Sequence, residues 1–95
     1  MRVITNRRLL EFAATHADAS EPLRAWRKAI EGGSYANFSG LRLAFRGVDK
    51  VRDLHVFNIA GNKYRLIAFV HYARQLCYIK HILTHVEYDR GDWKK

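Results

Sequence analysis

The sequence has a single cysteine, Cys77, and no long hydrophobic run. A lone cysteine rules out an intramolecular disulfide and indicates a reducing, intracellular location. No segment approaches the roughly 18 apolar residues that a membrane-spanning helix requires. Arg7, Arg8 and Glu11 interrupt the N-terminal apolar stretch, so it does not read as a secretion signal. We therefore expect a cytoplasmic protein without a membrane partner.

Patterns that mark metal, nucleotide and hydrolase sites are also missing. His81 and His85 could share a strand face, but the sequence has no HExxH motif, no cysteine pair and no carboxylate at ligand spacing. Gly61 belongs to a turn, so there is no glycine-rich phosphate loop, and no Ser–His–Asp arrangement can be argued. Cys77 lies in an apolar run that predicts a packing role rather than a nucleophile. We expect no metal and no cofactor.

Acidic residues are scarce relative to basic ones. The 95 residues include 17 Lys and Arg against 9 Asp and Glu, a formal net charge of +8. Residues 1–31 have a net charge of +2 and residues 32–95 a net charge of +6. This concentrated excess favours a polyanionic partner, either nucleic acid or an acidic protein. The alternative is that the charge only keeps a small protein soluble.

The composition, 48% hydrophobic and 27% charged, predicts one globular domain over residues 1–95. A short strand is expected within residues 1–5. Asn6 is expected to cap a helix that runs to about Ala17, and Ser20 to cap a second helix that Gly32-Gly33 ends. The apolar stripe of this second helix is Leu23, Trp26 and Ile30. The short link between the helices predicts an αα-hairpin with Trp26 as its core anchor.

Residues 34–54 show no clean period and are expected to form a long connection, which in a compact domain is usually functional or mobile. Basic side chains are mixed with aromatic ones in it, as suits an RNA-binding surface. The aromatic residues could equally pin the segment to the core, and the pattern does not separate the two interpretations. The residues concerned are Arg42, Arg46, Lys50, Arg52, Tyr35, Phe38 and Phe45.

From His55 onward the pattern predicts strands. Val56–Ile59 is followed by Gly61-Asn62, a two-residue hairpin signal, and then by a strand over Tyr64–Tyr72. A short turn at Ala73-Arg74 leads into residues 76–84. The sequence therefore predicts an α+β fold with an N-terminal αα-hairpin packed on a small antiparallel sheet.

The alternation of the middle strand sorts its side chains onto two faces. The cleaner apolar face, which should pack on the helices, consists of Tyr64, Leu66, Ala68 and Val70. Arg65 lies on the opposite, open face. With a two-residue second turn, Arg65 lies nearly opposite Ile82, and Lys80 shares the open face with Arg65. A three-residue turn moves Lys80 away.

Thr84 and Glu87 have the spacing of a capping box, which predicts a short C-terminal helix. Because the cap explains Glu87, we do not expect it to be a catalytic base. His85 falls at the start of this helix, where the dipole disfavours the protonated imidazole, so a neutral base is expected. Tyr88 and Asp89 lie on the same helical face as His85.

These residues suit cleavage of RNA through its 2′-hydroxyl. The reaction needs a base, a cation for the charge that develops on the phosphate, and an acid for the leaving 5′-oxygen. His85 could be the base or the acid. Arg65 could hold the phosphate with help from Lys80 or Lys63. Tyr88 could stack on a base or donate a proton. Each residue alone is unremarkable, and only their convergence points to catalysis.

The sequence as a whole resembles HigB-type toxins of the RelE/ParE superfamily. The resemblance lies in Val56-Phe57-Asn58-Ile59, Gly61-Asn62-Lys63-Tyr64-Arg65-Leu66, Tyr78-Ile79-Lys80 and Thr84-His85-x-Glu87-Tyr88-Asp89, with Ile4-Thr5 and Leu23-x-x-Trp26 upstream. His81-Ile82-Leu83 departs from the pattern and leaves the local strand packing open. The resemblance covers nearly the whole chain and implies a RelE-like fold.

The resemblance also implies a function. It indicates the toxin of a type II toxin–antitoxin system, an mRNA endoribonuclease that is typically ribosome-dependent and is neutralised by a helix–turn–helix antitoxin of the HigA kind. Arg65 would contact the scissile phosphate and His85 would transfer a proton, with Lys80 and Tyr88 completing the site. The expected RNA contacts are Lys63, Asn58, Arg42, Arg46, Lys50 and Arg52.

Two other functions stay open at this stage. The superfamily includes ParE-like gyrase poisons, so fold alone does not decide the activity. A non-enzymatic RNA- or ribosome-binding module would keep the basic segment without depending on His85. An intact set of Arg65, Lys80 and His85 favours the nuclease over both.

Overall fold

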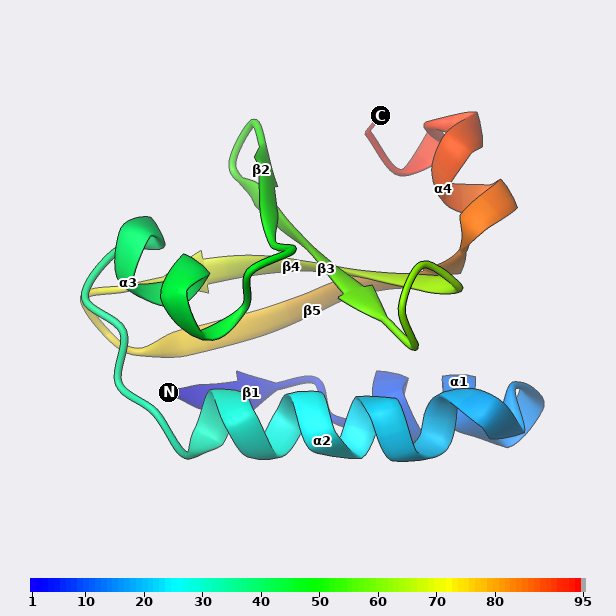
Figure 1. Cartoon of the computed structure of the whole chain (residues 1–95), viewed down its shortest axis with the longest axis horizontal. Coiled ribbons are helices and arrows are strands. Elements are labelled where there is room, and N and C mark those ends of the chain that lie inside the picture. The colour runs from blue at the N-terminus through cyan, green and yellow to red at the C-terminus, as the bar shows by residue number, and fades with distance from the viewer. Residues whose placement is uncertain (95) are drawn as a thin grey trace.

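The computed structural model describes residues 1–94, in which two N-terminal helices cover one face of a sheet and a short helix lies near the other face (Figure 1). In chain order the elements are β1 (Arg2–Ile4), α1 (Arg7–Thr15), the 3₁₀ turn η1 (Ala17–Ala19), α2 (Ser20–Glu31), α3 (Phe38–Ala44), β2 (Asp49–Val51), β3 (Leu54–Ile59), β4 (Tyr64–His71), β5 (Leu76–Thr84), α4 (His85–Arg90) and the 3₁₀ turn η2 (Asp92–Lys94). The predicted α+β class is confirmed.

The five strands are ordered β1-β5-β4-β3-β2. β2, β3, β4 and β5 pair antiparallel in succession, as expected. β1 is the exception, because it pairs in parallel with β5, with Val3 opposite Cys77. Among the described residues, no helix is long and apolar enough to cross a bilayer.

The main core lies between the sheet and the αα-hairpin. The predicted stripe of α2 is buried, with Ile30 fully enclosed. The rings of Trp26 and Phe57 of β3 pack edge to face, with their centroids 5.3 Å apart. The predicted apolar face of β4 belongs to the same cluster. Cys77 is also fully buried there, and burial raises the pKa of its thiol to about 12. The prediction of a packing cysteine is therefore confirmed.

Both predicted helix caps in the N-terminal region are wrong. The Asn6 side chain makes no capping hydrogen bond, and α1 ends at Thr15 rather than near Ala17. Ser20 is the first residue of α2, because η1 runs directly into that helix and the carbonyl of Ala17 accepts the Ser20 backbone N–H. A 3₁₀ turn has thus taken the place of a side-chain cap.

Residues 34–54 are more regular than their sequence indicated, since they contain α3 and β2. The side chain of Asn37 caps α3 by accepting the Gly40 N–H at 2.9 Å. The ring centroids of Phe45 and Phe57 lie 5.3 Å apart, and those of Phe38 and the buried His55 lie 5.5 Å apart. These aromatic residues therefore hold the segment against the core, as in the second of the two interpretations, and do not form an exposed surface for RNA. A helix of only seven residues is too short to show a clear period.

Both hairpin turns are longer than predicted. Ile59 pairs with Tyr64 and His71 with Leu76, so each connection has four residues rather than two. Ala60 and Gly61 in the first turn, and Gln75 in the second, have positive φ angles. Residues other than glycine rarely adopt positive φ angles, so the sequence pattern did not reveal these longer turns.

The register of β5 against β4 also differs from the conditional prediction. Arg65 lies opposite Leu83, and the pairing shifts after Ile67, so that Lys80 and His81 together stand against Ile67. This is the geometry of a β-bulge. The predicted pairing of Arg65 with Ile82, which required a two-residue turn, does not occur.

Candidate active site

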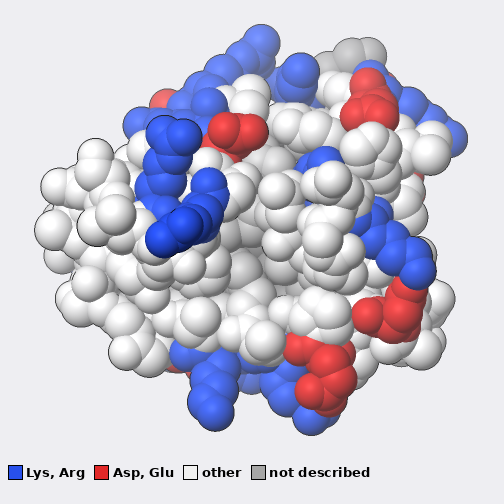
Figure 2. All heavy atoms as spheres, in the orientation of Figure 1, with Lys and Arg blue, Asp and Glu red and all other residues white. Residues whose placement is uncertain are grey.

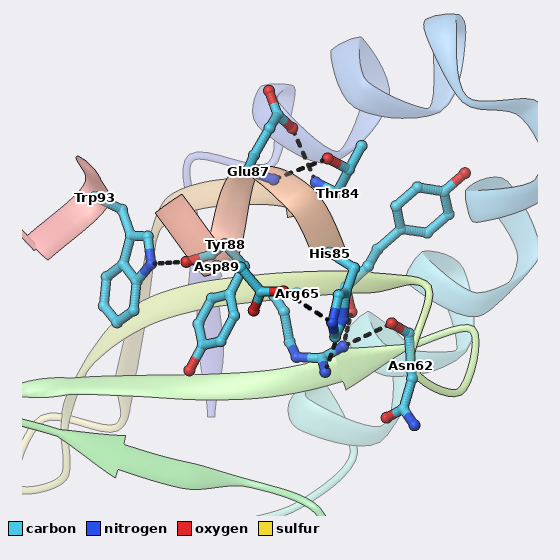
Figure 3. Close-up of polar contacts among 9 residues, drawn as sticks. Asn62, Arg65, Thr84, His85, Glu87, Tyr88, Asp89 and Trp93 are labelled. Carbon is cyan, nitrogen blue, oxygen red and sulfur yellow. Dashed lines mark hydrogen bonds and ion pairs between the residues drawn. The ribbon is translucent and has the colours of Figure 1, made fainter. Parts of the chain in front are cut away.

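Arg65 lies at the start of β4, on the face that the αα-hairpin does not cover. Its Nη1 donates to the backbone carbonyls of Asn62 at 2.9 Å and Tyr64 at 3.3 Å, and its Nη2 lies 3.3 Å from Nδ1 of His85 (Figure 3). The backbone of the β3–β4 turn thus fixes the guanidinium through its Nη1 atom. A guanidinium has five N–H donors. The Nε–H and one Nη2–H therefore have no partner among residues 1–94 and can bind a phosphate.

His85 is placed by the start of α4. The predicted capping box is confirmed, because Thr84 N–H donates to Glu87 Oε1 at 2.9 Å and Glu87 N–H donates to Thr84 Oγ1 at 3.2 Å. The hydrogen bond from the Thr84 backbone is the largest cause that lowers the pKa of the Glu87 carboxyl. The His85 N–H also donates to the Lys63 carbonyl at 3.2 Å, which ties the helix to the β3–β4 turn.

The imidazole of His85 lies between a cation and a carboxylate. Arg65 carries only donors, so Nδ1 must supply the lone pair in their contact. Nε2 lies 3.1 Å from Oδ2 of Asp89, one helical turn further on. With Nδ1 as the acceptor, the ring proton lies on Nε2, where it faces a carboxylate that can stabilise the imidazolium once Nδ1 accepts a second proton.

Tyr88, which the sequence predicted on the same helical face as His85, lies beside Arg65. Its ring centroid is 5.4 Å from Cζ of the guanidinium. On its other side it stacks on Trp93, with centroids 5.2 Å apart and planes 15° from parallel (Figure 3). Sequence reasoning missed Trp93, because no local pattern shows that a residue beyond α4 folds back over it.

The two predicted lysines do not join this group directly. Lys63 forms an ion pair with Asp18 of η1, which raises the pKa of the lysine. Tyr64 donates its hydroxyl to the same carboxylate at 2.5 Å. Lys80 is exposed at the bulge of β5, and in the described part of the chain it makes no hydrogen bond or ion pair with Arg65 or His85. Asp18 carried no sequence signal, because its partners lie 45 and 46 residues away.

Within residues 1–94, no basic side chain of the 34–54 segment forms a hydrogen bond or ion pair with Arg65 or His85. Arg42 and Arg46 line a shallow surface hollow at α3 together with Ser39 and the exposed Leu43. Figure 2 shows Lys and Arg side chains gathered over the surface that α3 and β2 form. This group, called here the α3–β2 surface, consists of Arg42, Arg46, Lys50 and Arg52, all exposed.

Asn58 lies on β3 directly opposite Arg65 and is exposed, with its amide 3.5 Å from the Gly47 carbonyl. Of the predicted RNA contacts, Asn58 is therefore the one that the strand pairing places directly beside Arg65. No group of three or more His, Cys, Asp or Glu side chains within residues 1–94 could hold a metal ion.

Residues 19–91 match the family model of HigB toxin, described as the RelE-like toxic component of a toxin–antitoxin system. The mRNA interferase toxin HigB of Escherichia coli strain K12 is 33% identical over 92 residues, which cover 94% of this chain and 88% of that protein. An mRNA interferase HigB of Escherichia coli O6:H1 is 25% identical over 93 residues, covering 95% and 90%. The match to the family model includes Arg65, His85, Tyr88 and Asp89 and ends before Trp93.

Proposed function

Because the chain belongs to the HigB family of RelE-like toxins, we propose that Arg65 and His85 form the centre of a nuclease site that cuts mRNA. The protein is the toxin of a toxin–antitoxin pair, an mRNA endoribonuclease whose antitoxin neutralises it. One observation carries the site assignment, namely that Nη2 of the Arg65 guanidinium and Nδ1 of the His85 imidazole lie 3.3 Å apart on the open face of the sheet.

The reaction begins with removal of the ribose 2′-hydroxyl proton. Nδ1 of His85 is the atom for this step, because it carries a lone pair and lies next to the donors that bind the adjacent phosphate. In this step Nδ1 exchanges its contact with Nη2 of Arg65 for the 2′-hydroxyl, while the Arg65 donors that have no protein partner bind the phosphate. Asp89 stabilises the resulting imidazolium through Nε2, so its role is to orient and support the base.

Attack of the 2′-oxygen on phosphorus builds negative charge on the phosphate oxygens. The guanidinium of Arg65 is held in advance by the carbonyls of Asn62 and Tyr64, so little rearrangement is needed as that charge grows. The products are a 2′,3′-cyclic phosphate and a free 5′-hydroxyl. The leaving 5′-oxygen takes a proton from Tyr88 or from Lys80, and the variants Tyr88→Phe and Lys80→Met separate these two donors.

The remaining parts of the proposal concern partners. We infer that mRNA is cut on the ribosome in the cytoplasm, with the α3–β2 surface, Asn58 and Lys63 contacting RNA. The support is the cluster of exposed cations on a chain of net charge +8. The antitoxin would be a helix–turn–helix protein of the HigA kind, and a basic toxin suits an acidic partner segment.

The test is induction of the protein without an antitoxin, followed by mapping of mRNA ends and inspection of DNA. Translation should stop, new mRNA fragments should carry 5′-hydroxyl ends, and DNA should remain intact. A 2′-deoxy substitution at the cleaved position should block the cut. DNA breaks with intact mRNA would establish the gyrase-poison alternative. Arrest by His85→Ala with intact mRNA would establish a non-enzymatic binding module.

A further inference from the structure

α4 carries three of the site side chains but buries none of its own residues. It has only six residues, too few to be stable as an isolated helix. Its N-terminal end is held by the Thr84–Glu87 capping box and by the His85 N–H bond to the Lys63 carbonyl. Something else must hold the C-terminal turn of α4, where Tyr88 and Asp89 lie.

The segment after α4 supplies that anchor. Gly91 adopts φ = 76°, a left-handed conformation that ends the helix and reverses the chain into η2. Trp93 is thereby returned to the sheet, where it is only 7% exposed and packs with Val56 and Ile67. Its indole N–H donates to the Tyr88 carbonyl at 3.0 Å.

The indole also continues into the site as a stack. Trp93 lies nearly parallel to Tyr88, and Tyr88 in turn lies 5.4 Å from the Arg65 guanidinium, so the phenol ring stands between the two (Figure 3). The neighbours of the Tyr88 ring leave its hydroxyl as the group that can reach substrate. This arrangement disfavours the earlier idea that Tyr88 stacks on an RNA base.

We propose that Trp93 is a positioning residue of the nuclease: its aromatic face sets the plane of Tyr88 and, through Tyr88, the orientation of the Arg65 guanidinium. The proposal rests on the proposed nuclease function. Trp93 does not touch the reacting atoms. Its effect must therefore appear in the rate of the cleavage step rather than in the affinity for RNA.

The experiment compares Trp93→Phe with Trp93→Leu. Both variants keep an apolar side chain at the buried position and lose the indole N–H, but only phenylalanine keeps a flat face against Tyr88. The cleavage of an mRNA bound to the ribosome is measured under single-turnover conditions over a range of toxin concentrations. Trp93→Leu should lower the maximal rate about tenfold to a hundredfold with little change in the half-saturating concentration. Trp93→Phe should recover most of the loss.

Trp26→Phe and Trp26→Leu are the matched controls, because Trp26 is equally buried on the other face of the sheet. These controls should lower the melting temperature without changing the maximal rate of the folded protein. Equal rates for Trp93→Phe and Trp93→Leu, with both folded, would overturn the proposal and leave Trp93 as a structural anchor. A wild-type protein that cuts no mRNA would instead refute the proposed function.

A second measurement applies even if Trp93→Leu does not fold. The chain has two tryptophans, so Trp26→Phe leaves Trp93 as the only indole. Its emission should change when Arg65→Ala is added and when a ribosome-bound mRNA with a 2′-O-methyl block at the cut site is supplied. Emission that responds to neither would show that Trp93 is not coupled to Arg65.

Discussion

The two faces of the sheet are stabilised in different ways. The helix-covered face buries a continuous apolar cluster in which Ile30, Leu66 and Cys77 are fully enclosed. The open face has a buried cluster of only Val56, Ile67 and Trp93. There, α4 depends on a capping box, the His85 N–H bond to the Lys63 carbonyl, the Trp93 indole bond to the Tyr88 carbonyl and the stack of Tyr88 on Trp93. The fold thus takes most of its stability from the face opposite the site, and the site takes its geometry from a few directional contacts.

The largest expected effect is on activity, and it separates the two faces. Arg65→Ala and His85→Ala should each reduce cleavage by about 10²–10⁴-fold, the usual contribution of a positioned catalytic group. The melting temperature should hardly change, since Arg65 is only half-buried and His85 is exposed. Arg74→Ala and His71→Ala are the controls, because they change the same residue types at the far end of β4. Loss of activity in these controls as well would contradict the site assignment.

The reverse result is expected on the helix-covered face. Ile30→Ala should lower the free energy of unfolding by about 2–5 kcal/mol, because Ile30 is fully buried and its removal leaves a cavity. Urea unfolding measures this loss. The cleavage rate per folded molecule at low temperature should remain close to wild type. A tenfold lower rate in the folded fraction would show that the two faces are coupled.

Acid should weaken the helix-covered face through His55. This histidine is 2% exposed, and burial lowers its pKa from 6.5 to about 4. Between those values only the unfolded chain binds the proton, so stability is present above pH 6.5 and falls as the pH drops toward 4, by up to roughly 3 kcal/mol. Urea midpoints at pH 7 and pH 5 report this slope. His55→Gln should flatten it, and an unchanged slope would assign it to other groups.

A smaller effect is expected at the cap of α4. Glu87→Ala should reduce stability by about 0.5–2 kcal/mol, since the Thr84 backbone N–H loses its acceptor. Activity should largely persist at low temperature and fall on warming as α4 frays. Glu21→Ala removes an exposed ion pair with Arg24 and is the neutral control. A folded but inactive Glu87→Ala protein would instead make Glu87 a catalytic group.

The smallest effect per residue is expected on the α3–β2 surface. Replacing Arg42, Arg46, Lys50 and Arg52 by Gln should weaken ribosome or RNA binding and flatten its salt dependence by up to about one unit of slope per lost phosphate contact. The matched control replaces four cations on the helix-covered side, namely Arg7, Arg8, Arg24 and Lys28. Equal losses from both sets would indicate a general charge effect rather than a docking surface.

Local patterns predicted those parts of the fold that local chemistry determines. The αα-hairpin, the strand meander and the capping box follow from periodicity and from residue types at fixed spacing. The resemblance to HigB toxins, which the comparisons confirm, supplied the family. It also pointed to Arg65 and His85, whose side chains the structure places in contact. Their catalytic roles stay predictions.

The features that escaped prediction depend on contacts across the chain. β1 pairs with a strand more than 70 residues later. The turn lengths depend on positive φ angles at Ala60 and Gln75, which those residue types do not signal. The bulge at Lys80 and the return of Trp93 to Tyr88 follow from packing against the finished sheet. Propensity and spacing carry no information on such contacts.

The parallel pairing of β1 with β5 has a consequence for synthesis of the toxin. A ribosome makes the chain from its N-terminus, so β1 waits for Leu76–Tyr78 before it can take its place. Contacts of such high sequence separation form slowly. His85 then follows Arg65 by twenty residues, and Trp93 comes later still. A nascent chain therefore emerges with Arg65 but without the imidazole opposite it, so the proposed site can be assembled only after α4 has emerged.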